Sequence, residues 1–128
     1  MIILRTGVDL VEIARLSYLD PPIYQRFRER ILTADELVEL GDQPQRLAAA
    51  FAVKEAVSKA LGCGIGPISW QDIHLSHLPN GEPRVALSGD AAKVAEDMKL
   101  TQWSVSISHS RTHAVAMVVA LGNSDPSS

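Results

Sequence analysis

The stretch from Gln45 to Gly66, QRLAAAFAVKEAVSKALGCGIG, limits most strongly what this chain can fold into. Its apolar residues cover nearly the whole circumference of a helical wheel, which is typical of a helix buried inside a domain. The charged residues between Leu47 and Leu61 are Lys54, Glu55 and Lys59. A buried charge is costly unless an opposite charge, a metal or a ligand compensates it, so these side chains need partners.

Two explanations of these three charges stay open on local grounds. In the first, Glu55 and Lys59 form an ion pair one turn apart within the helix, and Lys54 reaches solvent. In the second, the charges serve a ligand or a metal. Residues elsewhere in the chain must decide between these explanations.

Length and composition predict one domain that spans residues 1–121, followed by a polar, disordered tail at 122–128. The 128 residues are 46% hydrophobic and 21% charged, which suffices for one core. A net charge of -3 argues against a general nucleic-acid binder. The sequence lacks both a run long enough to cross a bilayer and a secretory leader, so we expect a cytoplasmic protein without a membrane partner. The single cysteine, Cys63, cannot form an internal disulfide.

Strand and helix patterns mix without regular alternation, which predicts an α+β fold with a small, largely antiparallel sheet wrapped on the buried central helix. Ile2 to Val8 reads as a first strand. Two hairpins are predicted, one around the turn PNGEP and one around SRTH. Further helices are expected at residues 23–32, after the capping box that Thr33 and Glu36 form, and at 90–99 with Ser88 as N-cap.

Asp9 is a lone acid in the apolar segment GVDLVEI. It either caps a short helix that runs through Arg15, or its charge is compensated by a group from elsewhere in the fold. Together, Asp9 and Glu55 would suit a magnesium ion that keeps several waters and a substrate's phosphates. Lys59, one turn after Glu55, would then face the same phosphates.

Three further features carry weaker signals. Glycines 62, 64 and 66 would let the chain leave the helix in a left-handed conformation and come close to a ligand. His109 ends a strand beside a tight turn, where it is either a core histidine or a site residue. Arg26 and Arg30 form a basic stripe, which is either a solvated face or a docking surface. We interpret His74 and His77 as structural or surface residues.

The residues Gly7-Val8-Asp9 and, from Phe51 to Lys59, FAVKEAVSK resemble the paired signature of the 4'-phosphopantetheinyl transferases. The short chain, the start GVDLVEIARL, the loop KALGCGIG and the strand SISHS are similar to the holo-[acyl-carrier-protein] synthase branch of that family. The resemblance spans roughly residues 2 to 121.

This resemblance implies transfer of the phosphopantetheine arm of coenzyme A to a serine of an apo acyl carrier protein, of fatty-acid or polyketide synthesis. It implies Mg2+ held by Asp9 and Glu55, and a catalytic Lys59 on the diphosphate. It also implies a homotrimer whose coenzyme sites lie between subunits. The coenzyme would lie against His109 and glycines 62, 64 and 66, and the acidic helix of the carrier would meet Arg15, Arg26 and Arg30.

One position departs from the family pattern. Many relatives have arginine immediately before the aromatic residue of the motif, where this chain has Ala50. We expect Arg46 or Lys54 to compensate in part.

The serine proton has several candidate acceptors: a water on the metal, Glu55, a carrier residue or His109. Two other functions stay open, a non-catalytic coenzyme A or nucleotide-binding module and a metal-dependent hydrolase.

Overall fold

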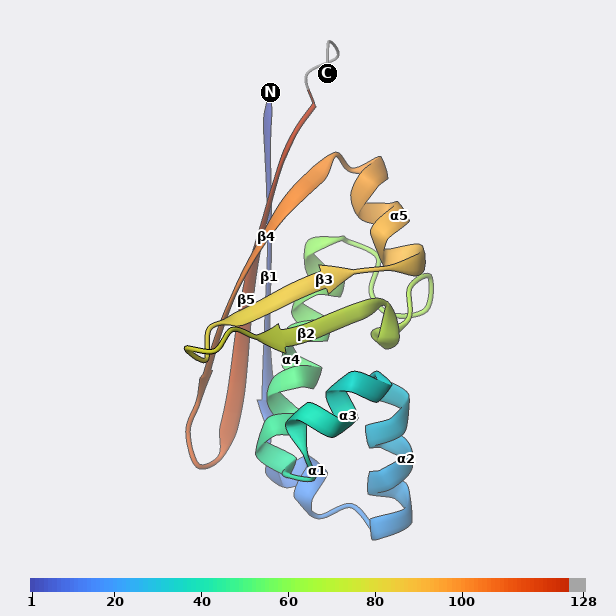
Figure 1. Cartoon of the computed structure of the whole chain (residues 1–128), viewed down its shortest axis with the longest axis vertical. Helices are drawn as coiled ribbons and strands as arrows, with labels where there is room; N and C mark the ends of the chain where they lie inside the picture. Colours follow the sequence, from blue (N-terminus) through green and yellow to red (C-terminus); the bar gives the residue numbers. More distant parts are fainter. Residues whose placement is uncertain (125–128) are drawn as a thin grey trace.

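Helix α4 (Pro44–Ala60) forms the centre of the structure, a computed structural model that describes residues 1–124 (Figure 1). The other elements are, in chain order, β1 (Ile2–Glu12), α1 (Ala14–Ser17), α2 (Pro21–Ile31), α3 (Ala34–Leu40), the short 3-10 helix η1 (Trp70–Asp72), β2 (Ile73–His77), β3 (Pro83–Leu87), α5 (Gly89–Asp97), β4 (Leu100–His109) and β5 (His113–Asn123).

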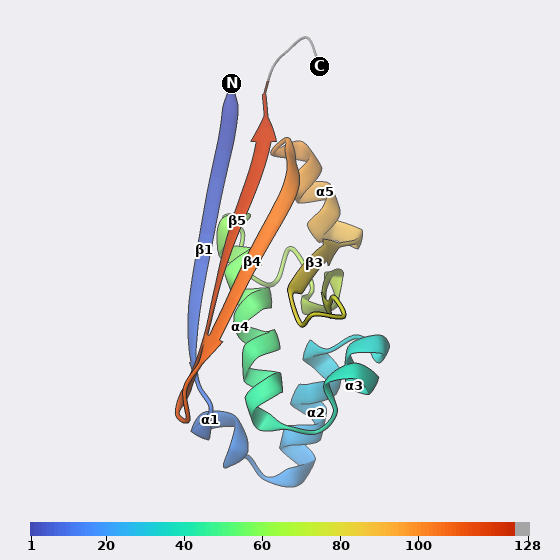
Figure 2. The same cartoon turned by 60° about the vertical axis from the view of Figure 1, so that its left-hand side comes forward.

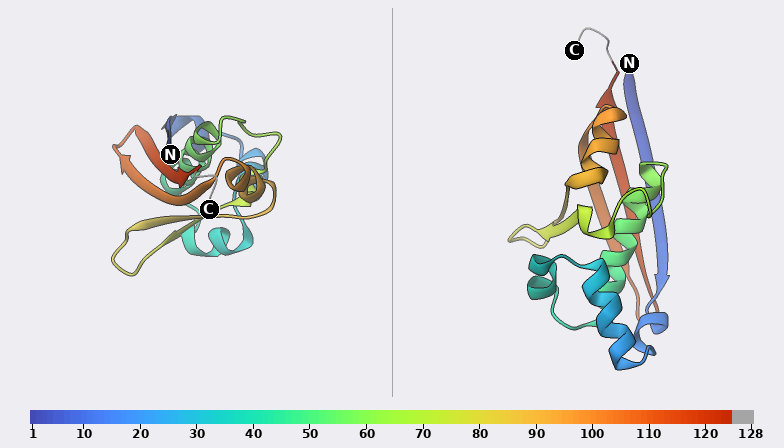
Figure 3. Two further views of the ribbon diagram at one scale, coloured as in Figure 1. Left: turned by 90° about the horizontal axis from the view of Figure 1, so that it is seen from above. Right: turned by 90° about the vertical axis from the view of Figure 1, so that its right-hand side faces the viewer.

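The strands form two antiparallel sheets. One has three strands in the order β1-β5-β4, and the other is the hairpin β2-β3. The three-stranded sheet packs one face against α4, and no other part of residues 1–124 covers its second face (Figure 2). Seen from above, α4 lies inside the curve of this sheet, with the hairpin beside β4 (Figure 3). The predicted α+β class and both predicted hairpins are confirmed.

Small residues explain how closely α4 packs on the sheet. Ala48, Ala52, Ala56 and Ala60 of the helix are fully buried, and β5 presents alternate small residues toward it. Alanine side chains are small enough to let the two backbones approach closely. The sheet encloses one side of the apolar helix α4, and helices and the hairpin enclose the other side. Arg5 of β1 completes the end of the helix, since its Nε donates to the carbonyl oxygen of Ala60 at 2.8 Å.

Several predicted boundaries need correction. Strand β1 continues to Glu12, so Asp9 lies within a strand opposite Ala116 and does not cap a helix. The ladder with β5 explains this extension, because pairing along the whole strand satisfies the backbone that a short helix would otherwise use. Strand β5 runs to Asn123, two residues beyond the predicted domain end, and residues 125–128 of the predicted tail lie outside the described residues.

Two helix starts were predicted from capping residues. The Thr33 and Glu36 capping box is present at the start of α3. At α5 the N-cap residue is Ser88 as expected, but its side chain makes no capping hydrogen bond. The Ser88 hydroxyl lies instead 3.4 Å from the carbonyl oxygen of Asp72.

Lys54 is completely buried, so the first of the two explanations above, in which it reaches solvent, is wrong. Its Nζ lies 2.6 Å from Oε1 of Glu36, which is also fully buried, and it donates to the carbonyl oxygens of Ile31 and Trp70. The other Glu36 oxygen accepts from the backbone N–H of Leu75 at 2.7 Å. Burial lowers the pKa of the Lys54 ammonium, and the Glu36 carboxylate acts in the opposite direction. This ion pair joins α4 to α2, α3, η1 and β2.

Within residues 1–124, no helix combines the length and the apolar character needed to cross a lipid bilayer.

We predict that Lys54→Met lowers the free energy of unfolding by about 3–5 kcal/mol, because it leaves the Glu36 carboxylate buried without its counter-charge. Urea denaturation followed by circular dichroism measures this change. Lys93→Met on the exposed side of α5 is the matched control, with an expected effect within about 0.5 kcal/mol. Similar effects of the two substitutions would contradict a buried, ionised pair.

Candidate active site

Gly7 brings β1 into direct contact with the backbone of α4. A Cβ atom at this position would lie 1.8 Å from the carbonyl oxygen of Ala56, so no other residue fits here without moving the strand. Asp9 is two residues further along the same strand and therefore points to the same, helix-facing side. The close approach at Gly7 thus sets the distance between Asp9 and the turn of α4 that carries Glu55 and Lys59.

Asp9 and Lys59 form an ion pair across this contact. The Lys59 Nζ lies 3.0 Å from Oδ1 of Asp9 and donates to the carbonyl oxygen of Val8 at 2.9 Å. The side chain of Asp9 is 17% exposed and that of Lys59 is 52% exposed, so the pair stays open to solvent on the lysine side. Lys59 therefore pairs with Asp9 across the strand, and the proposed Glu55–Lys59 pair within the helix is not formed.

Glu55 is half-buried, one helical turn before Lys59. Its Oε1 accepts a hydrogen bond from the indole Nε1–H of Trp70 at 3.0 Å. Sequence reasoning missed Trp70, although a tryptophan in apolar sequence signals an N–H group that needs a partner when the ring is buried.

Asp9 and Glu55 can supply two carboxylates to a divalent cation. Among the described residues, no cluster of three or more acidic, histidine or cysteine side chains could hold a metal. Magnesium, however, is commonly bound by only one or two carboxylates together with substrate phosphates and water. Each of the two acids has one carboxylate oxygen in a hydrogen bond, and its second oxygen makes none with any of residues 1–124. The donor set thus fits magnesium that arrives with a phosphorylated substrate.

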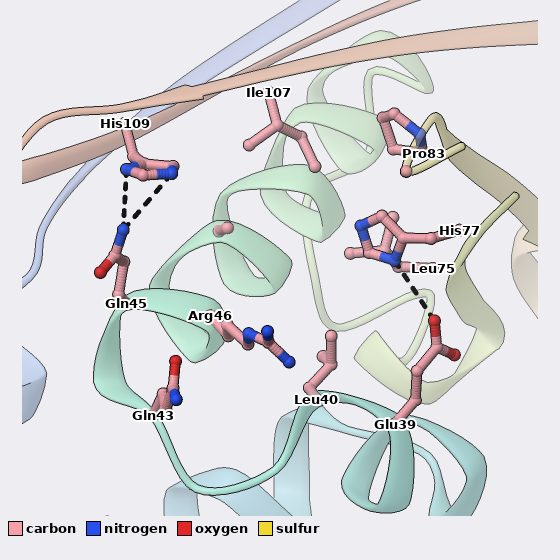
Figure 4. Close-up of a pocket in the computed structure, with 12 residues that line it drawn as sticks. Glu39, Leu40, Gln43, Gln45, Arg46, Leu75, His77, Pro83, Ile107 and His109 are labelled. Carbon is pink, nitrogen blue, oxygen red and sulfur yellow. Dashed lines mark hydrogen bonds and ion pairs between the residues drawn. The ribbon is translucent and has the colours of Figure 1, made fainter. Parts of the chain in front are cut away.

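Asp9, Glu55 and Lys59 form a first cluster, which we call the acidic site. His109 belongs to a second cluster, at the other end of α4. Its Nδ1 lies 2.7 Å from the side-chain nitrogen of Gln45, and both residues are exposed (Figure 4). They line a cavity of about 630 Å³, into which Arg46 extends from α4 (Figure 4). His109 is therefore not a buried core histidine. On the far side of the cavity His77, which the sequence indicated as a structural or surface residue, lies 3.3 Å from Glu39 and also lines the cavity.

The two clusters are separate within one chain. Gln45 and Glu55 are ten positions apart, which corresponds to roughly 15 Å along the helix axis. Strand β5 lies between Asp9 and His109, since Asp9 pairs with Ala116 and His109 pairs with Ala114.

The glycine loop follows the C-terminal end of α4, away from His109. Gly62 and Gly64 have φ values of +74° and +66°, which confirms the predicted left-handed exit from the helix.

The three predicted docking arginines lie on α1 and α2, and all are exposed. Arg30 connects this surface to the acidic site, because its guanidinium lies 5.5 Å from the centre of the Trp70 ring. Lys54 cannot help to replace the arginine missing at Ala50, since it is buried against Glu36. Arg46 remains the candidate.

Comparison with known proteins identifies the family. A family model described as the 4'-phosphopantetheinyl transferase superfamily matches residues 5–118. The chain belongs to this superfamily. This transferase is 40% identical over 126 residues to the holo-[acyl-carrier-protein] synthase of Herpetosiphon aurantiacus, covering 93% of this chain and 99% of the relative. It is 44% identical over 117 residues to that of Dehalococcoides mccartyi, covering 91% and 98%.

Solved structures agree with these relatives. The transferase is similar to the Helicobacter pylori holo-[acyl-carrier-protein] synthase in complex with coenzyme A, with a TM-score of 0.81 and 37% identity over 90% of this chain and 98% of that one. The Neisseria meningitidis synthase gives a TM-score of 0.82 at 35% identity, covering 91% and 96%. The expected resemblance to the synthase branch, and the expectation of an enzyme of that branch, are confirmed.

We predict that Gly7→Ala destabilises this transferase by about 3 kcal/mol or more, because the added methyl group overlaps the α4 backbone. Gly64→Ala is the control: its methyl group would meet no atom within 4 Å, so only the left-handed backbone should cost about 1–2 kcal/mol. Thermal and urea unfolding of both variants check the prediction. An equal loss in the two would show that the strand can move away from the helix.

Proposed function

We propose that this chain transfers the 4'-phosphopantetheine group of coenzyme A to a serine hydroxyl of an apo acyl carrier protein and releases adenosine 3',5'-bisphosphate. The observation that carries the proposal is the grouping of Asp9, Glu55 and Lys59 around one turn of α4. Membership of the superfamily, and relatives named as holo-[acyl-carrier-protein] synthases, support the choice of reaction.

Asp9 and Glu55 are the proposed ligands of Mg2+, each through the oxygen that makes no hydrogen bond within residues 1–124. When bound, Mg2+ would draw negative charge from the diphosphate of coenzyme A. Lys59 would contribute a second positive charge. Its ammonium group would leave Asp9 and pair with a substrate phosphate, while the aliphatic part of the Lys59 side chain stays beside β1. These residues would hold the phosphorus in line with the attacking serine oxygen, so that the new O–P bond forms as the P–O bond to the adenosine bisphosphate breaks. The hydroxyl proton would pass to one of the acceptors named above, a water on the metal, Glu55, a carrier residue or His109.

The adenosine end of coenzyme A is proposed to bind at the cavity beside His109. Gln45 and Arg46 add an amide and a cation that suit phosphate oxygens, and Arg46 thereby replaces the arginine missing at Ala50. A relative that was crystallised in complex with coenzyme A supports a coenzyme site in this fold. The role expected for glycines 62, 64 and 66 stays a prediction.

The carrier protein is proposed to dock on the exposed arginines of α1 and α2. Arg15, Arg26 and Arg30 give a local positive charge on a chain whose net charge is -3, which suits an acidic helix. The contact of Arg30 with Trp70, and of Trp70 with Glu55, brings this surface next to the proposed metal ligands. A serine on a docked carrier would therefore approach the acidic site.

A homotrimer is proposed to complete the site. The uncovered face of the three-stranded sheet carries apolar side chains that a monomer would leave in water, with Leu4 63%, Leu10 64% and Met117 50% exposed. Because Asp9 and His109 belong to separate clusters in one chain, a neighbouring copy that packs on this face can join the acidic site of one subunit to the coenzyme cavity of another. The cytoplasmic location expected from the sequence stays a prediction.

The transfer reaction has a direct test. We expect that incubation with Mg2+, coenzyme A and an apo acyl carrier protein increases the carrier's mass by one phosphopantetheine unit. Cleaved coenzyme with an unmodified carrier would identify a hydrolase, and an intact coenzyme with an unmodified carrier would identify a binding module. Asp9→Asn and Glu55→Gln should lower the rate at least about 100-fold because each removes a charged ligand. Asp90→Asn and Glu96→Gln on α5 are the matched controls, with unchanged rates.

The trimer is tested on the uncovered sheet face. We expect light scattering coupled to size-exclusion chromatography to give the mass of three chains for the unmodified protein and of one chain for Leu4→Glu, because a buried glutamate would oppose association. Val38→Glu on α3 is the control, since Val38 is 86% exposed but lies outside the sheet. The control should remain a trimer. An unmodified protein that runs as a monomer would contradict the proposal.

A further inference from the structure

The hydrogen bond from Trp70 to Glu55 is a charge-assisted contact at the edge of the proposed metal site. The indole donates to Oε1 at 3.0 Å, and among the described residues no donor reaches Oε2. A free glutamate can rotate about three side-chain bonds, and each of these must be fixed before the carboxylate can bind a cation. A rigid donor on one oxygen would fix the plane of the carboxylate and leave the second oxygen available.

Trp70 is itself held from both ends by two neighbouring residues of α4. Lys54 Nζ lies 3.1 Å from the Trp70 carbonyl oxygen, while the Trp70 indole reaches Glu55, the next residue of the helix. Lys54 is fixed by its buried pair with Glu36. The backbone of Trp70 therefore has little freedom relative to α4, and its side chain is aimed at Glu55.

The surroundings of the Trp70 ring also restrict it. Phe51, one turn before Glu55, lies against the ring with a centroid separation of 6.1 Å, and Arg30 lies over it at 5.5 Å. The next residue, Gln71, donates to the carbonyl oxygens of Glu29 and Leu32 at the end of α2. A tryptophan that only filled space would not need a carboxylate partner, because its N–H could reach a backbone carbonyl or solvent.

We propose that Trp70 is a positioning residue that orients the Glu55 carboxylate for the divalent cation. This inference rests on the proposed function only in that it takes Glu55 as a metal ligand. Trp70 acts through Glu55, and Lys54 acts in turn on Trp70.

A spectroscopic test uses the two tryptophans of the chain. In protein labelled with 15N-tryptophan, Trp103→Phe leaves one indole N–H signal, which belongs to Trp70. We expect this signal to move upfield in Trp103→Phe/Glu55→Gln, where a neutral amide replaces the charged acceptor. Addition of MgCl2 with coenzyme A should shift it in Trp103→Phe and not in the double variant. A signal that stays in place in both comparisons would overturn the proposal.

A second test separates positioning from packing. Trp70→Phe keeps a ring but loses the N–H, so we expect the Mg2+ concentration for half-maximal transfer to rise about 10- to 100-fold. The rate at saturating Mg2+ and the KM for the carrier should stay within a few-fold of the unmodified protein. Trp103→Phe is the matched control and should change none of these three quantities. A lower rate with an unchanged Mg2+ requirement would indicate packing alone and would overturn the proposal.

Failure of the proposed function can be told apart from failure of this inference. If the unmodified protein transfers nothing, calorimetry with MgCl2 and coenzyme A replaces the rate measurement. A weaker apparent Mg2+ affinity in Trp70→Phe than in Trp103→Phe would still support the positioning role, and equal affinities would overturn it.

Discussion

The contact between Gly7 and the carbonyl oxygen of Ala56 is the constraint on which the rest of the site depends. It brings a strand and a helix together at a distance that a side chain would forbid, and it does so two residues before Asp9. Everything that Asp9 meets on α4 follows from this approach, including its ion pair with Lys59. The motif Gly-Val-Asp is thus a packing requirement followed by a carboxylate, because the glycine determines where the acid lies.

The Lys54 and Glu36 pair performs the same task on the other side of α4. A charged lysine inside a core is unfavourable alone, but here three oxygen atoms surround its Nζ and connect α4 to elements that are far apart in the chain. The neighbouring residue, Glu55, is therefore presented from a helix whose position is fixed by both the sheet and this pair. In the motif Lys-Glu one residue holds the scaffold, and the other is available for a ligand.

Much of this arrangement could be predicted from the sequence, and the exceptions have physical reasons. The all-round apolar pattern predicted the buried α4, and the capping box predicted the start of α3, because both signals are local. The first strand was predicted to end at Val8, just before Asp9. Its true length could not be read from the sequence, because pairing with β5, more than 100 residues later, decides how far β1 extends. The burial of Lys54 and the partner of Glu55 were missed for the same reason: Glu36 and Trp70 reach α4 only through tertiary packing.

The separation of the two clusters within one chain and the uncovered apolar face of the sheet both point to the proposed trimer. If a monomer bound coenzyme A alone, the coenzyme would have to extend from the cavity beside His109 around α4 to Glu55. A row of apolar side chains would also remain in water on the opposite side of the sheet. Under the proposed trimer a single change relieves both problems, because association covers the apolar face and sets one copy's acids beside another copy's cavity. Catalysis would then depend on assembly, and residues such as Leu4 that never touch substrate would control activity through the association equilibrium.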